Sequence, residues 1–287
     1  MNLDRRNFFK TIGIAGLTLA TGKASGKTPA DAGGQTEFFG MLYDSTRCVG
    51  CRACETACAE AHGLPEPKDE LVTGVKRKTS ETQRTAINKY NTSKGEALVK
   101  NQCMHCNEPA CAAACLTSAM YKTKEGPVIW RGDKCMGCRY CMVSCPFDVP
   151  KFEYNSPNPK IQKCDLCYDR VIKGGIPACA EICGDALTFG TRRELVAEAH
   201  KRIAGNPDQY VDKIYGEDVA GGTGLLYLTA VPPEELGLRT DLQNSSYPAL
   251  TKGFLYSVPA VFVLLPPLLL GIHEAIKNNN HNPEENE

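Results

Sequence analysis

The chain has 16 cysteines in 287 residues, and they fall into four groups of four with none left over. The groups are Cys48, Cys51, Cys54 and Cys58; Cys103, Cys106, Cys111 and Cys115; Cys135, Cys138, Cys141 and Cys145; and Cys164, Cys167, Cys179 and Cys183. In the first and third groups the spacing is C-x2-C-x2-C-x3-C, in which three close cysteines bind one iron–sulfur cluster and the fourth binds another. The other two groups keep the opening pair and the closing x3 step. The pattern predicts four [4Fe-4S] clusters as cofactors.

An internal duplication indicates how these groups are organised. The segment from Cys48 to Cys54 resembles that from Cys135 to Cys141, and a Pro-Ala-Cys tripeptide ends at both Cys111 and Cys179. Short strands are expected after the cluster helices, at 118–120 and 185–187. Repeats of this kind indicate duplicated loop, helix and strand units as in bacterial ferredoxins. We therefore predict an α+β fold with tandem ferredoxin-like bicluster modules over residues 40–192.

Three other uses of the cysteines are less consistent with this spacing. Repeated C-x2-C steps are poor geometry for disulfides. Zinc sites use isolated pairs, often with histidine, and would leave the x3 step without a role. A single cluster with structural cysteines elsewhere would leave most of the grouping unexplained.

The two ends of the chain point to export and membrane anchoring. Residues 1–26 match a twin-arginine signal peptide, with Arg5-Arg6 followed by Phe8, Phe9 and Lys10 and then a short apolar stretch; the alternative is a basic amphipathic helix. Residues 253–273 are expected to form a transmembrane anchor, with 274–287 as its tail; a buried core helix is the alternative. Export would place the body on the periplasmic face of the cytoplasmic membrane.

Two further segments flank the cysteine groups. Residues 63–96 form a polar, lysine- and arginine-rich insertion without apolar periodicity, which predicts a surface lobe or a partner-docking loop. Residues 193–250 form a C-terminal extension. It starts at a capping box, Thr191 to Glu194, which opens an amphipathic helix.

Charge and motif content restrict the function. With 33 basic and 33 acidic residues, no global field favours nucleic acid. No nucleophile motif, phosphate-binding glycine loop or leftover cysteine is present, so an electron carrier without a catalytic site of its own is expected. An independent small-substrate reductase and a disulfide-bonded envelope protein remain as alternatives.

Residues 40–48, 102–106 and 138–146 resemble the four-cluster ferredoxin-like subunits of the dimethyl sulfoxide reductase and formate dehydrogenase type. Within this type they resemble the subunits of quinone-linked periplasmic nickel-iron hydrogenases. The segment 215–232 with the anchor also resembles the counterpart in high-molecular-weight cytochrome complexes. The resemblance implies a catalytic partner (nickel-iron hydrogenase, multihaem cytochrome c or molybdopterin enzyme) and a polytopic quinone-reactive membrane subunit.

The same resemblance implies that ligands cross over between groups. Four sets follow: set A, Cys48, Cys51, Cys54 and Cys183; set B, Cys58, Cys164, Cys167 and Cys179; set C, Cys103, Cys106, Cys111 and Cys145; and set D, Cys115, Cys135, Cys138 and Cys141. The chain departs from the family in having proline after only one closing cysteine, as Pro146.

Several residues beside the cysteines could tune the clusters or serve the fold. Positive charge favours the reduced cluster, and the candidates are Arg47, Arg52, Lys134, Arg139 and Lys163; all could equally be surface charges. His105 could donate to a cluster sulfur or stabilise its loop. His273 could contact a haem or quinone.

Overall fold

The computed structural model describes residues 37–279. The expected signal peptide and the last residues of the tail lie outside this range. Export and cleavage therefore stay predictions.

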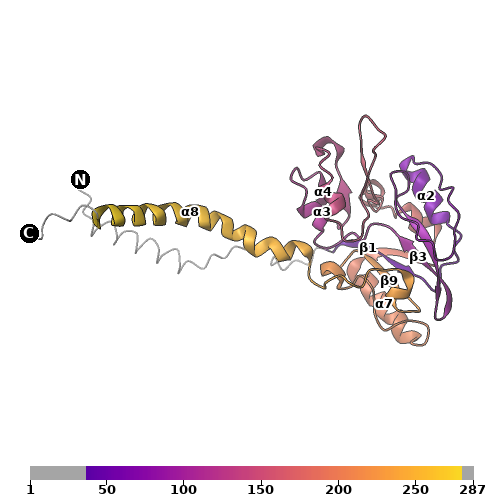
Figure 1. Cartoon of the computed structure of the whole chain (residues 1–287). Coiled ribbons are helices and arrows are strands. Elements are labelled where there is room, and N and C mark those ends of the chain that lie inside the picture. Colours follow the sequence, from indigo (N-terminus) through magenta and orange to yellow (C-terminus); the bar gives the residue numbers. More distant parts are fainter. Residues whose placement is uncertain (1–36, 280–287) are drawn as a thin grey trace, which may run out of the picture. The chain divides into compact units, whose positions relative to one another are not determined.

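A small mixed sheet forms the centre of the described chain (Figure 1). Strand β1 (Phe39–Asp44) pairs antiparallel with β8 (Leu187–Thr191) and parallel with β9 (Leu225–Leu228). Helix α7 (Arg192–Gly205) packs on this sheet and begins at the predicted capping box, with both hydrogen bonds present. Leu195, Ala199 and Ile203 of α7 are buried, as the helical periodicity predicted.

Short elements surround the cysteines. The helices are α2 (Ala53–His62), α3 (Ala110–Ala113), α4 (Tyr140–Val143), α5 (Tyr168–Val171) and α6 (Ala178–Ile182). Three two-stranded ribbons pair β2 (Ala86–Thr92) with β3 (Gly95–Asn101), β4 (Met120–Lys122) with β5 (Val128–Trp130), and β6 (Lys151–Phe152) with β7 (Ile161–Gln162). Three 3-10 turns, η1 (Gly132–Lys134), η2 (Val219–Gly221) and η3 (Pro233–Leu236), complete the body. The strands expected after two cluster helices are β4 and β8, so the mixed α and β character is confirmed.

Two helix pairs bring distant cysteine groups together. Helix α2, from the first group, packs on α6, from the fourth, and α3 packs on α4. This pairing of first with fourth and second with third parallels the crossover implied by the resemblance.

The polar segment 63–96 is more deeply folded than a surface lobe. It contributes β2, whose residues Ala86 and Ile87 are buried, and it buries Arg77 at 7% exposure. The reason is Glu55 on α2, which is 2% exposed and accepts hydrogen bonds from Arg77 and from the Ile87 backbone N–H. A buried carboxylate needs such donors, and they come from this segment.

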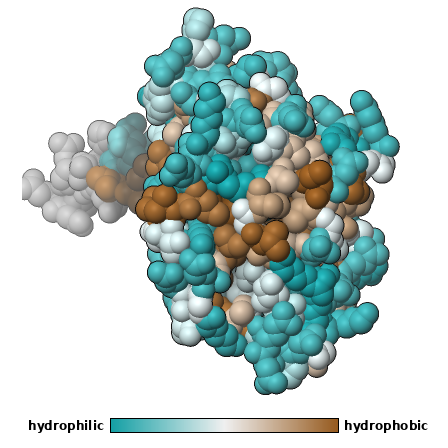
Figure 2. All heavy atoms as spheres, turned by 90° about the vertical axis from the view of Figure 1, so that its right-hand side faces the viewer, coloured by the Kyte–Doolittle hydropathy of each residue, from teal (hydrophilic) through white to brown (hydrophobic). Residues whose placement is uncertain are grey.

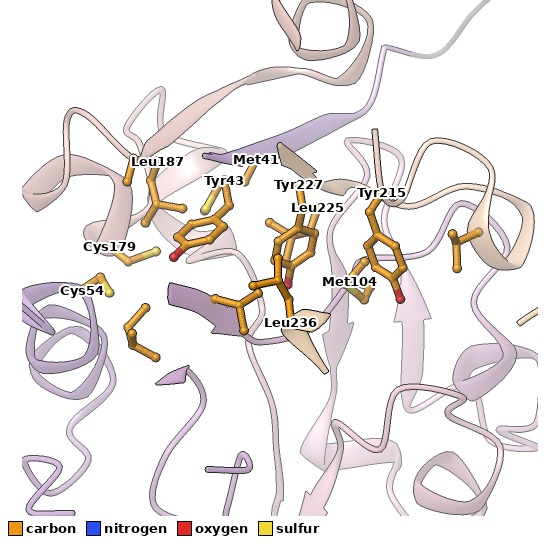
Figure 3. Close-up of a cluster of buried hydrophobic side chains, with 14 of the residues drawn as sticks. Met41, Tyr43, Cys54, Met104, Cys179, Leu187, Tyr215, Leu225, Tyr227 and Leu236 are labelled. Atoms are coloured by element: carbon orange, nitrogen blue, oxygen red, sulfur yellow. The ribbon is translucent and has the colours of Figure 1, made fainter. Parts of the chain in front are cut away.

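Three tyrosines connect the sheet to the ribbons (Figure 3). The ring centroids of Tyr43 and Tyr227 are 5.7 Å apart, as are those of Tyr227 and Tyr215, with steep interplanar angles. Each hydroxyl donates to a backbone carbonyl, that of Tyr227 to Lys100 at 2.7 Å. Apolar rings with satisfied hydroxyls suit a buried position, and these rings form the core between the cysteine groups.

Helix α8 (Tyr247–Asn279) contains the expected anchor and has three prolines in its interior, Pro259, Pro266 and Pro267. Its segment Tyr247–Lys277 has a mean hydropathy of 2.1 over an 18-residue window that is not buried in the protein. It is long and apolar enough to cross a membrane, as predicted.

Candidate iron–sulfur sites

A left-handed residue recurs at the same place in each cysteine group. The residue two positions after the first cysteine has a positive φ in all four: 73° at Gly50, 49° at His105, 73° at Gly137 and 60° at Leu166. Loops that alternate right- and left-handed residues turn successive backbone N–H groups inward and form anion-binding concavities, which many iron–sulfur sites use. The backbone therefore repeats fourfold, beyond the duplication visible in the sequence.

The first and third groups share a second left-handed residue. Arg52 and Arg139 have φ values of 62° and stand immediately before α2 and α4. For residues other than glycine this conformation is uncommon and has to be held by the surrounding structure. Its occurrence at equivalent positions shows that the two loops are built alike.

The four thiols of set D line one cavity together with Trp130, which lies in β5 beside the third group. Burial, together with the neighbouring thiolates of Cys115, Cys135 and Cys138, raises the pKa of the Cys141 thiol to about 11. Cys115, from the second cysteine group, thus faces Cys135, Cys138 and Cys141 of the third.

Set C converges in the same way. Burial raises the pKa of Cys106 to about 12, with contributions from the thiolates of Cys103 and Cys145. Burial also raises the pKa of Cys111, and the same two thiolates add to the effect.

Sets A and B converge across the α2–α6 helix pair. Burial raises the pKa of Cys48, and the thiolates of Cys54 and Cys183 add to it. Burial likewise raises the pKa of Cys58 to about 12, with Cys179 and Cys167 as neighbouring thiolates. The two cysteines of α2 therefore have different neighbouring thiols, as the implied sets A and B require.

The chemistry of these positions fits 4Fe-4S clusters. All sixteen cysteines are free thiols in the structure. Thiolates gathered in fours repel one another, and burial removes the water that would screen them. Iron cations offset both the repulsion between the thiolates and the loss of screening water, since a thiol that coordinates a metal is deprotonated outright. The inward N–H groups at the loops would then stabilise the anionic cluster.

The sets follow one another in a line. Cys179 of set B has Cys54 of set A as a neighbouring thiolate. Cys164 of set B and Cys103 of set C belong to one group of packed, buried side chains. Cys111 of set C and Cys141 of set D belong to another such group. The order is thus A, B, C, D.

The two ends of this line reach the surface. Only Cys51, in set A, and Cys138, in set D, are exposed among the sixteen cysteines. Large apolar side chains are exposed beside both, with Val49 at 83% near set A and Leu116 at 82% near set D. Figure 2 shows the side of the molecule that carries α2, where an apolar band crosses a mainly hydrophilic face.

The residues flagged beside the cysteines differ in their surroundings. Arg52 bonds Glu55, Arg47 pairs with Asp44, Arg139 lies over two aromatic rings and Lys134 is exposed. Lys163 alone among them has a polar atom within hydrogen-bond range of a cysteine sulfur, 3.9 Å from Cys103 Sγ, in the described part of the chain.

The two flagged histidines also differ. His105 is buried, and its Nδ1 accepts a 3.0 Å hydrogen bond from the Val128 N–H, so it fastens its loop to β5. Its Nε2 has no hydrogen-bond partner in residues 37–279. His273 lies on α8, within the apolar segment Tyr247–Lys277, and its haem or quinone contact stays a prediction.

Two residues that sequence reasoning missed lie against cysteines. His62, at the end of α2, has Nε2 3.6 Å from Cys167 Sγ. Lys100 on β3 is fully buried, and Cys54, Cys58 and Cys179 are among its neighbouring thiolates. Both lie far from these cysteines in sequence, so only the spatial convergence reveals them.

Loops with a recurring left-handed residue, short helices and thiols gathered in fours define a ferredoxin-like iron–sulfur protein. Residues 96–192 match the 4Fe-4S dicluster domain family. The hydrogenase-2 operon protein HybA of Escherichia coli O157:H7 is 37% identical over 98% of this chain and 97% of its own length. The formate dehydrogenase iron-sulfur subunit of Haemophilus influenzae is 32% identical over 91% of each chain. A protein of Nitratidesulfovibrio vulgaris Hildenborough is 44% identical over 96% of this chain and 77% of its own.

The chain therefore belongs to the family of ferredoxin-like iron–sulfur subunits that includes HybA and the formate dehydrogenase iron-sulfur subunits. Its resemblance to this family, predicted from the cysteine segments, is confirmed. It is an iron–sulfur electron-transfer subunit with 4Fe-4S clusters as its cofactors.

Proposed function

We propose that this chain carries four [4Fe-4S] clusters, one in each of sets A to D, and relays electrons along them between two partner subunits. The observation that supports this most is the line of four thiol sets with an exposed cysteine at each end. Two interlocked bicluster modules, A with B and C with D, make up residues 40–192. Partners dock at the exposed ends, and the chain needs no substrate site of its own.

The end of the line near set D faces the membrane. The backbone N–H groups of Ala220 and Gly221 bond the carbonyls of Gln243 and Asn244, which fixes the chain just before α8 to the body. Next to this, the Ser246 hydroxyl donates to Glu108, two residues before α3. Helix α3 carries Cys111 and leads to Cys115 of set D. The membrane helix thus begins on the side of sets C and D.

The partners follow from the position of the membrane helix on the side of sets C and D. Set A exchanges electrons with an exported catalytic or cytochrome c subunit, and set D with a polytopic, quinone-reactive membrane subunit. The HybA similarity favours a nickel-iron hydrogenase as the catalytic partner. The formate dehydrogenase similarity supports a second candidate, the corresponding subunit of a molybdopterin oxidoreductase complex. In both cases the body lies on the periplasmic face of the membrane.

Metal analysis tests the cofactor content. Anaerobically purified full-length chain is expected to contain about 16 iron and 16 labile sulfide atoms, four of each per cubane. Zinc in place of iron, or quantitative disulfides, would refute the proposal. Turnover of a small redox substrate by the isolated chain would favour an independent reductase instead.

The crossover of ligands has its own test. Replacing Cys58 by serine is expected to alter the electron paramagnetic resonance signal of the cluster in set B, because its other ligands come from the fourth group. The matched variant Cys54→Ser, one helical turn away on α2, is expected to alter the cluster in set A. If both variants change the same signal, the sets are wrongly assigned.

A further inference from the structure

Two buried lysines lie where consecutive thiol sets meet. Lys163 is 2% exposed and Lys100 is fully buried. Neither makes an ion pair with a carboxylate within residues 37–279. An unpaired buried charge is costly, so a buried ammonium group needs an anion nearby. For these two lysines the nearby anions are the cysteine thiolates.

Lys163 lies between sets B and C. Its Nζ donates to the backbone carbonyl of Cys164, in set B, at 2.8 Å, and lies 3.9 Å from the Sγ of Cys103, in set C. It also donates to the carbonyl of Val128 on β5. These three contacts hold the ammonium group in one place, between two cluster positions.

Lys100 lies between sets A and B. Among the described residues its Nζ has one hydrogen-bond partner, the Thr85 hydroxyl at 2.5 Å. The thiols of Cys54 in set A and of Cys179 and Cys58 in set B are its main electrostatic neighbours. Its strand β3 pairs with β2 at Ile87, whose N–H binds Glu55 between the two cysteines of α2.

We propose that Lys163 and Lys100 are fixed positive charges shared by neighbouring clusters, which raise the reduction potentials of the clusters on both sides. This rests on the four-cluster assignment above. Reduction adds a negative charge to a cluster, and a nearby ammonium group in a site of low dielectric stabilises that charge more than water-screened surface lysines do. Set B, which borders both lysines, receives the largest effect.

A redox titration followed by electron paramagnetic resonance tests the proposal on the anaerobically purified full-length chain. Lys163→Met is expected to lower the potentials of the clusters in sets B and C, each by at least a tenfold change in the redox equilibrium, or 59 mV for one electron. Lys100→Met is expected to lower those in sets A and B. The signals of sets A and B are identified by Cys54→Ser and Cys58→Ser, and that of set C by Cys145→Ser.

Two comparisons separate charge from packing. Lys134→Met removes an exposed lysine adjacent to Cys135 and is expected to leave all four potentials unchanged. Lys163→Arg keeps the charge and is expected to keep the potentials near those of the wild type. Unchanged potentials in Lys163→Met, or equal shifts in Lys134→Met, would overturn the proposal.

Iron analysis of each variant makes the remaining outcomes decisive. If Lys163→Met loses its clusters while Lys163→Arg retains them, a positive charge at this position is required, as proposed. If both lose iron, Lys163 has a packing role and the proposal is wrong. If the wild-type chain holds no iron, the four-cluster function itself fails, which is a different result.

Discussion

Removing the carboxylate of Glu55 is expected to loosen the helix that serves two thiol sets at once. The side chain of Glu55 is 1% exposed, and its oxygens accept from Arg77 Nη1 at 2.7 Å, from Arg77 Nη2 at 3.0 Å and from the Ile87 N–H at 2.5 Å. Arg52, the left-handed residue before α2, donates to it as well. In Glu55→Ala the guanidinium of Arg77 stays buried and, within the described part of the chain, keeps only the Ile87 carbonyl and a 3.4 Å contact with Asp69.

The expected size of the effect follows from this burial. Breaking a buried ion pair by removing one partner costs about 3 to 5 kcal/mol. If the lower value appears entirely in the barrier to unfolding, the chain unfolds roughly 150-fold faster, since each 1.36 kcal/mol is tenfold in rate. Glu55→Gln keeps the shape and one acceptor oxygen but loses the charge, so its rate is expected to lie between those of Glu55→Ala and the wild type.

The assay is the rate of bleaching of the cluster absorbance in denaturant under strict anaerobiosis. A rate is appropriate because cluster loss makes unfolding irreversible. The control is Glu96→Ala on the β2–β3 hairpin, which removes a 2.7 Å ion pair with Lys89. The Glu96 side chain is 55% exposed, so water screens this pair and the rate is expected to stay at the wild-type value. If Glu55→Ala and Glu96→Ala bleach at the same rate, the buried pair does not stabilise α2 and the reasoning is refuted.

Four other outcomes are expected. Gly40→Ala would place a Cβ 2.4 Å from the Gly224 carbonyl oxygen and is expected to destabilise the sheet by about 1–3 kcal/mol. Alanine at its strand partner Gly190, where the nearest contact is at 3.6 Å, should be tolerated. Equal melting temperatures of the two variants would contradict this. Removal of iron with a chelator is expected to unfold the α3, α4 and β4–β5 region first, because its core contains cysteines, whereas α7 packs in a core without cysteines. Hydrogen exchange measures the order of unfolding, and uniform loss of protection would contradict this expectation. Truncation after residue 246 is expected to move the iron-containing body to the soluble fraction on cell fractionation, and a body that stays in the membrane would disprove anchoring by α8 alone. Replacing Arg5-Arg6 by Lys-Lys is expected to keep the chain in the cytoplasm, and unchanged export would exclude the twin-arginine route.

The insertion shows where sequence reasoning reached its limit. Residues 63–96 lack apolar periodicity, and this pattern predicts a surface segment. Arg77 is nevertheless buried because Glu55, far away on α2, supplies its counter-charge. A pattern within one segment contains no information on the partner that compensates a charge from another segment. Strand β9 was missed for the same reason, since its pairing with β1 is a long-range contact.

The sequence by itself determined the cofactor chemistry, the mixed α and β character and the apolar anchor, because cysteine spacing, helix capping and hydropathy are local properties of the chain. It also specified which loops repeat, but not the left-handed residues His105 and Leu166, which take a conformation that their type does not require. Only the tertiary structure decided which thiols converge, which two cysteines reach the surface, and that Lys100, His62 and Lys163 lie against cysteine sulfurs or thiolates. These depend on the packing of α2 on α6 and of α3 on α4, where segments distant in sequence meet and burial gives each charge its effect.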